Sequence, residues 1–306
     1  MTNLTGYLAP AGCVADLVTE LGDVAAVHDR LVLATGPRRP AAWAADVWLD
    51  PVRIPVKSIS DAARALRAIQ PHWALYSFHL HRRAQLIAEQ LPPLKLAPSP
   101  FPAPKRPVGS WTLLDEHTVL AAKCCSASFP NGEIEFIENH TEPPSRAYLK
   151  LWELFSRLQV WPRAGERCLD LGACPGGWTW VLDNLGARVL AVDKTPLEPR
   201  VAQRPGVEFR AESAFGLDPR DVGPVDWLFS DVICYPARLL KLVERWLAAG
   251  TVRNFVCTLK FQGATDHATA RAFAAIPGSR VLHLHHNRHE LTWFRLAPEL
   301  MPGGDV

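Results

Sequence analysis

The apolar residues between positions 143 and 300 follow two spacings, one typical of buried strands and one typical of helices. Short apolar runs predict five buried strands at 168–171, 189–192, 207–210, 225–230 and 254–259. Apolar residues at helical spacing predict helices at 145–158, 178–185, 236–249 and 266–275. A final strand pair is expected at 280–285 and 292–296. The alternation of strands and helices indicates an α/β fold with a Rossmann-like, doubly wound sheet.

The first 125 residues show shorter segments with the same two spacings. Strands are predicted at 4–8, 24–34, 45–49, 73–78, 109–114 and 118–125. Helices are predicted at 12–21, 58–69 and 79–91, with Ser58 as an N-cap. This pattern favours a smaller α+β domain, ferredoxin-like or a reduced THUMP-like module. We therefore expect an N-terminal domain at 1–125, a connector at 126–142 and the Rossmann-like domain at 143–300.

Two segments are expected to lack regular structure. The proline-dense stretch 92–107 cannot form a regular helix or a central strand, which predicts an extended connector. The alternative is a short basic contact with phosphates through Lys105 and Arg106. Residues 297–306 are expected to form a frayed tail.

Composition narrows the class of protein only slightly. The chain has 306 residues and a net charge of +2, so a nucleic-acid surface would have to come from local patches. Seven scattered cysteines form no CxxC pair or zinc-ligand spacing, which predicts free thiols, a reducing compartment and no metal site. No signal peptide or membrane-spanning run is visible. These features predict a cytoplasmic protein.

A glycine-rich turn, Gly172-Ala173-Cys174-Pro175-Gly176-Gly177, follows the first strand of the larger domain. Its small residues let backbone N–H groups approach a ligand, but it has neither dinucleotide-fingerprint spacing nor the Gly-Lys-Ser/Thr of a phosphate loop. Asp193, at the end of the next strand, can accept both hydroxyls of a ribose. Asp170 would repel a pyrophosphate and attract an ammonium, so the pattern favours S-adenosylmethionine. The alternative is that Asp170 caps the helix and the glycines only turn the chain.

Four charged residues occupy positions suited to a reaction. Asp231 and Lys260 end the fourth and fifth strands, Lys150 lies on the helix before the sheet, and Glu290 begins the last strand. The carboxyl ends of parallel strands share one crevice, so Asp231 and Lys260 are expected to lie near each other and near the cofactor. Any one of these residues alone would be read as a surface charge or a turn former. Their ordered set carries the prediction.

The segments DLGACPGGW and SRAYLKL resemble the cofactor loop and entry helix of the FtsJ-type ribose 2'-O-methyltransferases. The resemblance is clearest from about 143 to 296 and is greatest to enzymes that act on a cytidine of bacterial large-subunit ribosomal RNA. It implies a class I methyltransferase fold and an RNA-recruiting N-terminal region. The family's Lys-Asp-Lys-Glu tetrad matches the local motifs SRAYLK, SDV, TLKF and HNRHELT, which contain Lys150, Asp231, Lys260 and Glu290.

The chemistry of this reaction accounts for the residue types. A ribose 2'-hydroxyl must lose its proton as it attacks a methyl group. We expect Lys260 to accept the proton, with Lys150 lowering the pKa of Lys260 and holding the hydroxyl. Asp231 and Glu290 would orient the two lysines. No metal is required.

The cofactor is expected to contact residues from the entry helix and from the ends of four strands. The candidate set is Ser145, Asp170, Gly172, Cys174, Pro175, Gly176, Gly177, Trp178, Asp193, Glu212, Ser213 and Asp231. Glu212 and Ser213 are alternatives for the contact with adenine, and Trp178 is a candidate either for cofactor contact or for core packing. The histidines at 283, 285, 286 and 289 lack the partners of a metal site. With Arg288, these histidines are expected to touch RNA phosphate or to lie at the surface.

The sequence thus predicts an enzyme that transfers a methyl group from S-adenosylmethionine to a ribose 2'-oxygen of RNA. The expected substrate is a cytidine of large-subunit ribosomal RNA, with no DNA, membrane or obligate protein partner. One alternative is a non-catalytic RNA-binding or ribosome assembly factor that keeps the fold. Another is a related 2'-O-methyltransferase of transfer RNA or of the mRNA cap.

Overall fold

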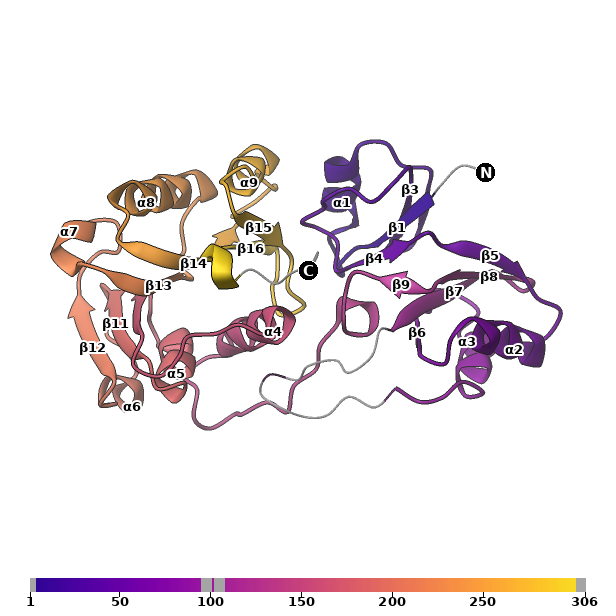
Figure 1. The fold of residues 1–306 in the computed structure, drawn as a ribbon, viewed down its shortest axis with the longest axis horizontal. Coiled ribbons are helices and arrows are strands. Elements are labelled where there is room, and N and C mark those ends of the chain that lie inside the picture. The colour runs from indigo at the N-terminus through magenta and orange to yellow at the C-terminus, as the bar shows by residue number, and fades with distance from the viewer. Residues whose placement is uncertain (1–3, 95–100, 102–107, 301–306) are drawn as a thin grey trace. The chain divides into compact units, whose positions relative to one another are not determined.

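A computed structural model describes residues 4–94, 101 and 108–300. These residues divide into two compact units between Glu135 and Phe136, inside the connector expected at 126–142 (Figure 1). The first part of that segment packs within unit 1, since the Ser126 hydroxyl accepts the Val47 N–H at 2.9 Å. Most of the proline-dense stretch, including Lys105 and Arg106, lies outside the described residues, as does most of the expected tail.

Unit 2 is built on a seven-stranded mixed sheet with the strand order β12-β11-β10-β13-β14-β16-β15 (Figure 1). Its strands are β10 (Arg167–Leu171), β11 (Arg188–Asp193), β12 (Val207–Ala211), β13 (Val225–Ser230), β14 (Val252–Lys260), β15 (Ser279–Leu282) and β16 (Glu290–Arg295). Strands β10 to β14 run parallel, and β16 is antiparallel to both of its neighbours. The strand order reverses direction between β10 and β13, which places a ligand crevice at their carboxyl ends.

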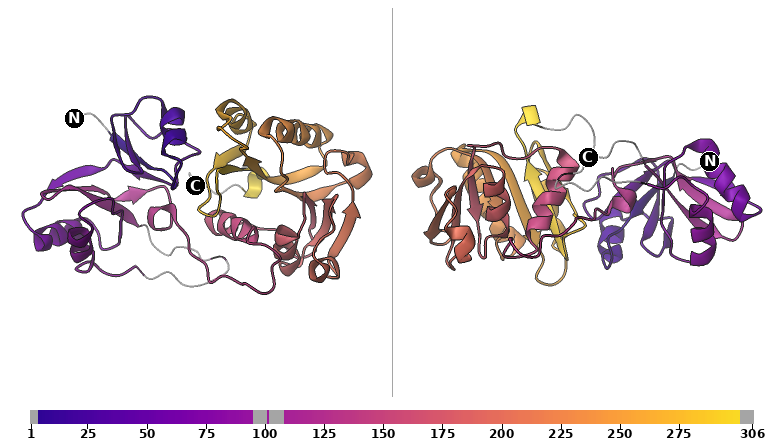
Figure 2. Two further views of the ribbon diagram at one scale, coloured as in Figure 1. Left: turned by 180° about the vertical axis from the view of Figure 1, so that it is seen from behind. Right: turned by 90° about the horizontal axis from the view of Figure 1, so that it is seen from below.

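Helices cover both faces of this sheet. They are α4 (Tyr148–Leu158), α5 (Gly177–Asn184), α6 (Pro199–Ala202), α7 (Pro219–Val222), α8 (Pro236–Ala249) and α9 (His267–Ala274), followed by the 3₁₀ turn η2 (Pro298–Leu300). Figures 1 and 2 show α4 and α5 on one face and α8 and α9 on the other. Strands such as β13 are apolar and buried along almost their whole length because both faces are covered. The Rossmann-like α/β prediction is therefore confirmed.

Unit 1 contains two sheets, ordered β2-β3-β1-β4-β9 and β5-β8-β7-β6. The strands of the first sheet are β1 (Leu4–Leu8), β2 (Ala26–His28), β3 (Leu31–Thr35), β4 (Asp46–Leu49) and β9 (Cys124–Cys125). The strands of the second are β5 (Val52–Pro55), β6 (Trp73–Leu75), β7 (Gly109–Asp115) and β8 (Thr118–Ala122). The helical segments are α1 (Val14–Leu21), α2 (Ile59–Ile69), α3 (His81–Ala88) and the 3₁₀ turn η1 (Pro130–Gly132).

The second sheet and its helices follow the order β-α-β-α-β-β, whereas a ferredoxin-like domain follows β-α-β-β-α-β. The second sheet therefore does not follow the ferredoxin-like order, and the α+β prediction for this unit is confirmed as to class only. The strand expected at 24–34 is a hairpin of β2 and β3, because Asp29 turns the chain with a φ of 54°. Ser58 does cap α2, accepting the Asp61 N–H at 3.1 Å.

Three short elements had no counterpart in the sequence pattern: β5, α6 and α7. Several expected elements are shorter in the structure, among them the strand expected at 73–78, which is β6, and the helix expected at 79–91, which is α3. Helix α4 begins at Tyr148 rather than Ser145, and β15 ends at Leu282 rather than His285. Across the described residues, every helix is too short or too polar to cross a lipid bilayer.

Candidate active site at the carboxyl ends of the strands

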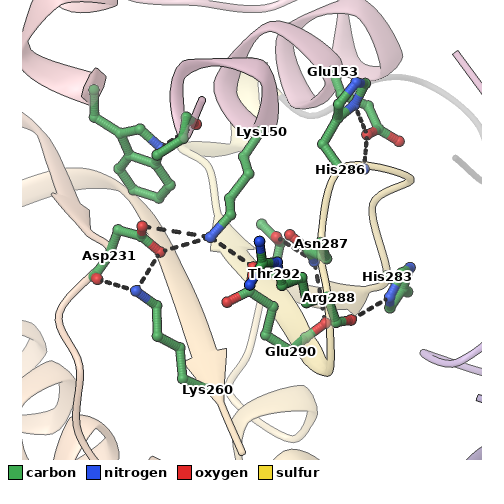
Figure 3. Close-up of polar contacts among 12 residues, drawn as sticks. Lys150, Glu153, Asp231, Lys260, His283, His286, Asn287, Arg288, Glu290 and Thr292 are labelled. Carbon is green, nitrogen blue, oxygen red and sulfur yellow. Dashed lines mark hydrogen bonds and ion pairs between the residues drawn. The ribbon is translucent and has the colours of Figure 1, made fainter. Parts of the chain in front are cut away.

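The four charged residues expected to act together come from four different elements and meet at one place (Figure 3). Asp231 follows β13, Lys260 ends β14, and Glu290 begins β16 directly opposite Lys260 in the antiparallel register. Lys150 reaches them from the first turn of α4. The convergence follows from the sheet order, which sets β13, β14 and β16 side by side.

Direct contacts hold the cluster together. The Lys150 ammonium lies 2.6 Å from Glu290 Oε1 and 3.1 Å from Asp231 Oδ1. The Lys260 ammonium lies 3.1 Å from the same Asp231 oxygen and donates to the Asp231 carbonyl oxygen at 2.5 Å. Asp231 therefore bridges the two lysines, as Figure 3 shows.

The charges in this cluster are close to balanced, with two ammonium and two carboxylate groups. Burial disfavours the Lys150 ammonium, but the carboxylates of Asp231 and Glu290 outweigh burial and raise the pKa of Lys150. Lys150 is therefore held in its protonated form. The Lys260 side chain remains 19% exposed, against 12% for Lys150, so it is the more accessible of the two side chains.

The glycine turn beside the cluster has a shape that only small residues allow. Gly172 has a φ of 77°, and a Cβ there would lie 2.8 Å from Val232. Gly176 has a φ of 113° and is the N-cap of α5, and a Cβ on Gly177 would lie 2.5 Å from Ser145 Oγ. The turn between β10 and α5 therefore packs so closely against Val232 and Ser145 that a larger side chain would not fit at these glycines.

Two buried polar atoms beside this turn lack a hydrogen-bond partner within the protein: Asp170 Oδ1 and Ser145 Oγ. The other Asp170 oxygen accepts the Thr179 hydroxyl at 2.7 Å. Burial raises the pKa of Asp170 to about 7, assisted by the charges of Asp231 and Asp193 and opposed by the Thr179 hydrogen bond. A buried carboxylate with one free oxygen suits a cationic group, so these residues fit the ammonium end of S-adenosylmethionine.

The remaining candidate cofactor residues lie around the same crevice. Asp193 ends β11 and accepts the N–H of Cys174 at 3.1 Å. This hydrogen bond links Asp193, the residue expected to bind the ribose hydroxyls, to the glycine turn. The peptide between Cys174 and Pro175 is cis. Glu212 and Ser213 both follow β12, and the Ser213 hydroxyl accepts the Phe215 N–H at 3.4 Å.

Trp178 occupies the core rather than the crevice wall. Its side chain is 3% exposed, and its indole N–H donates to the Ala147 carbonyl oxygen at 2.9 Å. The ring also meets Phe229 edge to face, with 6.2 Å between ring centroids. Of the two alternatives for Trp178, this environment favours core packing.

A functionally placed residue that the sequence pattern missed is Glu153, one helical turn after Lys150 (Figure 3). It is fully buried, and its carboxylate accepts the N–H groups of His285 and His286 at 2.7 and 2.9 Å. The His286 ring nitrogen Nδ1 lies 2.8 Å from Glu153 Oε2, and Arg157 pairs with Glu153 Oε1 at 2.8 Å. Despite burial, these donors lower the pKa of Glu153 to about 2. Glu153 thus ties α4 to the turn that precedes Glu290.

The histidine-rich run is part of this turn and is more buried than expected. His283 is 3% exposed, its Nε2 lies 2.9 Å from the Arg288 carbonyl oxygen, and burial lowers its pKa to about 4. His286 is held by Glu153. The expectation of a surface position is therefore wrong for His283, whereas His286 is partly exposed and His285 is exposed. In the part of the chain that the structure describes, no group of three or more potential ligands is arranged for a metal ion.

The fold and the site together define a class of protein. A seven-stranded sheet with β16 inserted antiparallel, a glycine turn after β10 and a Lys-Asp-Lys-Glu cluster are the features of a class I methyltransferase. Residues 143–266 match the family model of FtsJ-like methyltransferases. Unit 2 therefore carries an FtsJ-like methyltransferase domain, a family that uses S-adenosylmethionine, and the resemblance noted in the sequence is confirmed.

Curated relatives narrow the comparison further. The chain is 40% identical over 169 residues to ribosomal RNA large subunit methyltransferase M of Halorhodospira halophila, which covers 52% of this chain and 49% of that protein. It is 35% identical over 186 residues to the protein of the same name from Thauera aminoaromatica, covering 56% and 50%. The matched region spans about half the length of these relatives. Among solved structures, TrmN from Thermus thermophilus aligns with 95% of this chain and 98% of its own at 16% identity and a TM-score of 0.37, too low to carry an argument.

Proposed function

We propose that this protein methylates a ribose 2'-hydroxyl of RNA, using S-adenosylmethionine, and that its substrate is a cytidine of large-subunit ribosomal RNA. The observation that carries the proposal is the bridged Lys150–Asp231–Lys260–Glu290 cluster beside the glycine turn. The names of the curated relatives support ribosomal RNA as the substrate class.

The geometry suggests separate roles for the two lysines. When bound, S-adenosylmethionine would supply a methyl group activated by its sulfonium. Lys150, kept protonated by two carboxylates, would hold the 2'-oxygen and stabilise the negative charge that develops on it. Lys260, whose side chain is the more exposed of the two, would act as general base in its neutral amine form, taking the hydroxyl proton to become the ammonium that pairs with Asp231. Asp231 would fix the distance between the two amines.

Cofactor binding is assigned to residues on the other side of Asp231. Asp170 and Ser145 would contact the amino-acid end, since each has a buried oxygen without a partner. Asp193 would contact the ribose hydroxyls while it holds Cys174. The glycine turn would surround the methionine part, and Glu212 or Ser213 would contact adenine from the end of β12.

The test is a methyl-transfer assay with labelled S-adenosylmethionine and unmodified total RNA, with the label mapped by size and by 2'-O-methyl-sensitive cleavage. Label at one ribose of large-subunit RNA is expected. Lys260→Ala should reduce the rate about 10²–10⁴-fold, the typical contribution of a general base, while cofactor affinity stays unchanged. Near-normal transfer by Lys260→Ala would remove Lys260 from the mechanism.

Two other outcomes of this assay would contradict ribosomal RNA as the substrate. Label in transfer RNA or at an mRNA cap would keep the chemistry and replace the substrate. Cofactor binding without transfer to any RNA, including precursor RNA, would favour a non-catalytic assembly factor.

A further inference from the structure

The loop between β13 and α8 exposes two large apolar side chains directly after the reaction cluster. Ile233 is 78% exposed and Tyr235 is 66% exposed. Cys234 between them is buried, as is Pro236 after them. The loop therefore exposes both an isoleucine and a tyrosine to solvent.

The short sequence separation keeps Ile233 and Tyr235 close to Asp231. Asp231, which contacts both lysines, lies two residues before Ile233 and four before Tyr235. A residue spans at most about 3.6 Å, so the Ile233 Cα lies within about 7 Å and the Tyr235 Cα within about 14 Å of the Asp231 Cα. A ribose that reacts at this cluster carries its base on the carbon next to the 2'-carbon. The base of that nucleotide or of its neighbour therefore falls within reach of the loop.

A positive charge follows these side chains in the chain, in the first turn of α8. Arg238 lies one helical turn after Tyr235, and its N–H donates to the Tyr235 carbonyl oxygen at 2.9 Å. Its guanidinium stacks on Phe215, with Cζ 3.8 Å from the ring centroid. The Arg238 side chain is exposed, so its charge faces solvent. An aromatic ring beside a positive charge is the combination by which proteins bind unpaired nucleotides, since bases stack on the ring and phosphates are attracted to the cation.

We propose that Ile233 and Tyr235 form a stacking surface for an unpaired nucleobase of the RNA, next to the reacting ribose. The inference rests on the proposed function and adds a substrate-binding site to it. Tyr235 supplies the flat face on which the base stacks, and Ile233 packs against the same nucleotide. Arg238 attracts the adjoining phosphate. The surface therefore favours RNA that is unpaired at or beside the target nucleotide.

The test compares three substitutions in the full chain: Tyr235→Ala, Tyr235→Phe and, as a matched control, Trp161→Ala. Trp161 is also an exposed aromatic residue of unit 2, 36% exposed, but it precedes β10 and so lies toward the opposite end of the strands. Stacking of one base is worth about 1–3 kcal/mol, so Tyr235→Ala should raise the KM for RNA about 5- to 100-fold. Tyr235→Phe and Trp161→Ala should stay within about twofold of the unsubstituted protein. The Kd for S-adenosylmethionine should not change in any of them, and the Tm should not change in the two Tyr235 variants, because the Tyr235 side chain is exposed.

Direct RNA binding, measured by filter retention of a labelled single-stranded fragment, is a second readout that does not depend on methyl transfer. If only Tyr235→Ala weakened RNA binding, the result would support the stacking surface whether or not the RNA is methylated. A lack of methylation by the unsubstituted protein would instead refute the proposed function and leave the stacking surface supported. Unchanged KM and unchanged RNA binding in Tyr235→Ala would overturn the inference. Equal losses in Tyr235→Ala and Tyr235→Phe would also overturn it, because they would assign the effect to the hydroxyl and not to the ring.

Discussion

Helix α4 carries two charged clusters one turn apart, and they differ in how completely their charges are satisfied. The Lys150 cluster is partly open to solvent, with its four side chains between 10% and 19% exposed. The Glu153 cluster is closed: Glu153 is 0% exposed, and its two oxygens accept from Arg157, from two backbone N–H groups and from the His286 ring.

This difference separates a site that can act on a substrate from one that can only hold structure. The Glu153 carboxylate is inaccessible, and both of its oxygens already accept hydrogen bonds. Its pKa of about 2 also means that it carries no proton to donate near neutral pH. Lys260, by contrast, keeps a side chain that is 19% exposed and can reach a substrate beside Asp231. Both clusters nevertheless act on one segment, because Glu290 pairs with Lys150 and the turn before Glu290 is held by Glu153.

The largest effect is expected from Asp231→Ala, which removes the bridge between the two lysines. Two ammonium groups would then face each other with only Glu290 to balance them, and Lys260 would lose its carboxylate contact. We expect methyl transfer to fall about 10²–10⁴-fold, as for loss of a positioned proton-transfer group. Single-turnover rates with saturating RNA would measure this. A rate within tenfold of the unsubstituted protein would show that the bridge does not position the reacting groups.

The second-largest effect is expected from Glu153→Gln, which breaks the closed cluster. A carboxamide can accept hydrogen bonds on one side only, so its NH₂ group must face either the Arg157 side or the His286 side of the cluster. Breaking a buried, charged cluster costs about 3–5 kcal/mol, so urea unfolding of the full chain should show a loss of this order for unit 2. We also expect a drop in kcat of about tenfold, because the turn that carries Glu290 is loosened.

A matched control is Asp183→Asn at the far end of α5. Asp183 accepts from Arg204 at 2.7 Å and is 14% exposed, so it is also a largely buried carboxylate paired with an arginine. Helix α5 runs back from the glycine turn, which places its last residues away from the carboxyl ends of the strands. Asp183→Asn should lose stability and keep kcat within about twofold. If Glu153→Gln also kept its kcat, Glu153 would stabilise the fold without positioning the reaction cluster.

The sequence predicts the open cluster much better than the closed one, and the reason is physical. Asp231 and Lys260 directly follow apolar runs, and parallel strands bring such positions to one edge. Glu153 binds backbone N–H groups 132 and 133 residues away, and a backbone donor leaves no trace in residue type. The burial of His283 was missed for a similar reason, because a histidine-rich run reads as polar.

Local signals that were present could have located some of the missed elements. Helices α6 and α7 both begin with an acidic residue followed by proline, a common helix start. In each helix the acidic side chain accepts the N–H two residues on. The hairpin of β2 and β3 gave no such signal, since Asp29 takes the left-handed conformation that glycine usually supplies.

Asp170 resembles the Glu153 cluster in its burial and the Lys150 cluster in being incompletely satisfied. It is fully buried, but one of its oxygens has no hydrogen-bond donor. Its pKa of about 7 in the folded protein lies above the value of 3.8 for a free aspartate. The folded state therefore holds the proton more tightly, and the resulting stabilisation is complete below about pH 4 and lost as pH rises through about 7. A shift of about 3 units corresponds to at most about 4 kcal/mol.

Asp170→Asn should remove this pH dependence, so that it is more stable than the unsubstituted protein at pH 8 when no cofactor is bound. The same substitution should weaken binding of S-adenosylmethionine, because the ammonium loses its counter-charge. Urea unfolding and calorimetric titration between pH 5 and 8 would measure both. Parallel stability curves for the two proteins would contradict the buried, protonated state of Asp170.

The smallest effect is expected from His286→Leu, which separates the ring contact from the backbone contacts of Glu153. The leucine keeps an apolar body beside Phe136, whose ring centroid lies 5.4 Å from that of His286. It removes the ring donor at 2.8 Å and leaves the N–H groups of residues 285 and 286 in place. One hydrogen bond to a charged acceptor is worth about 1.5–3 kcal/mol, and the remaining donors should hold the loss near the lower value. A loss in unfolding free energy equal to that of Glu153→Gln would mean that the ring, and not the backbone, anchors the turn. A clearly smaller loss with unchanged kcat would show that the two backbone N–H groups alone keep Glu290 beside Lys150.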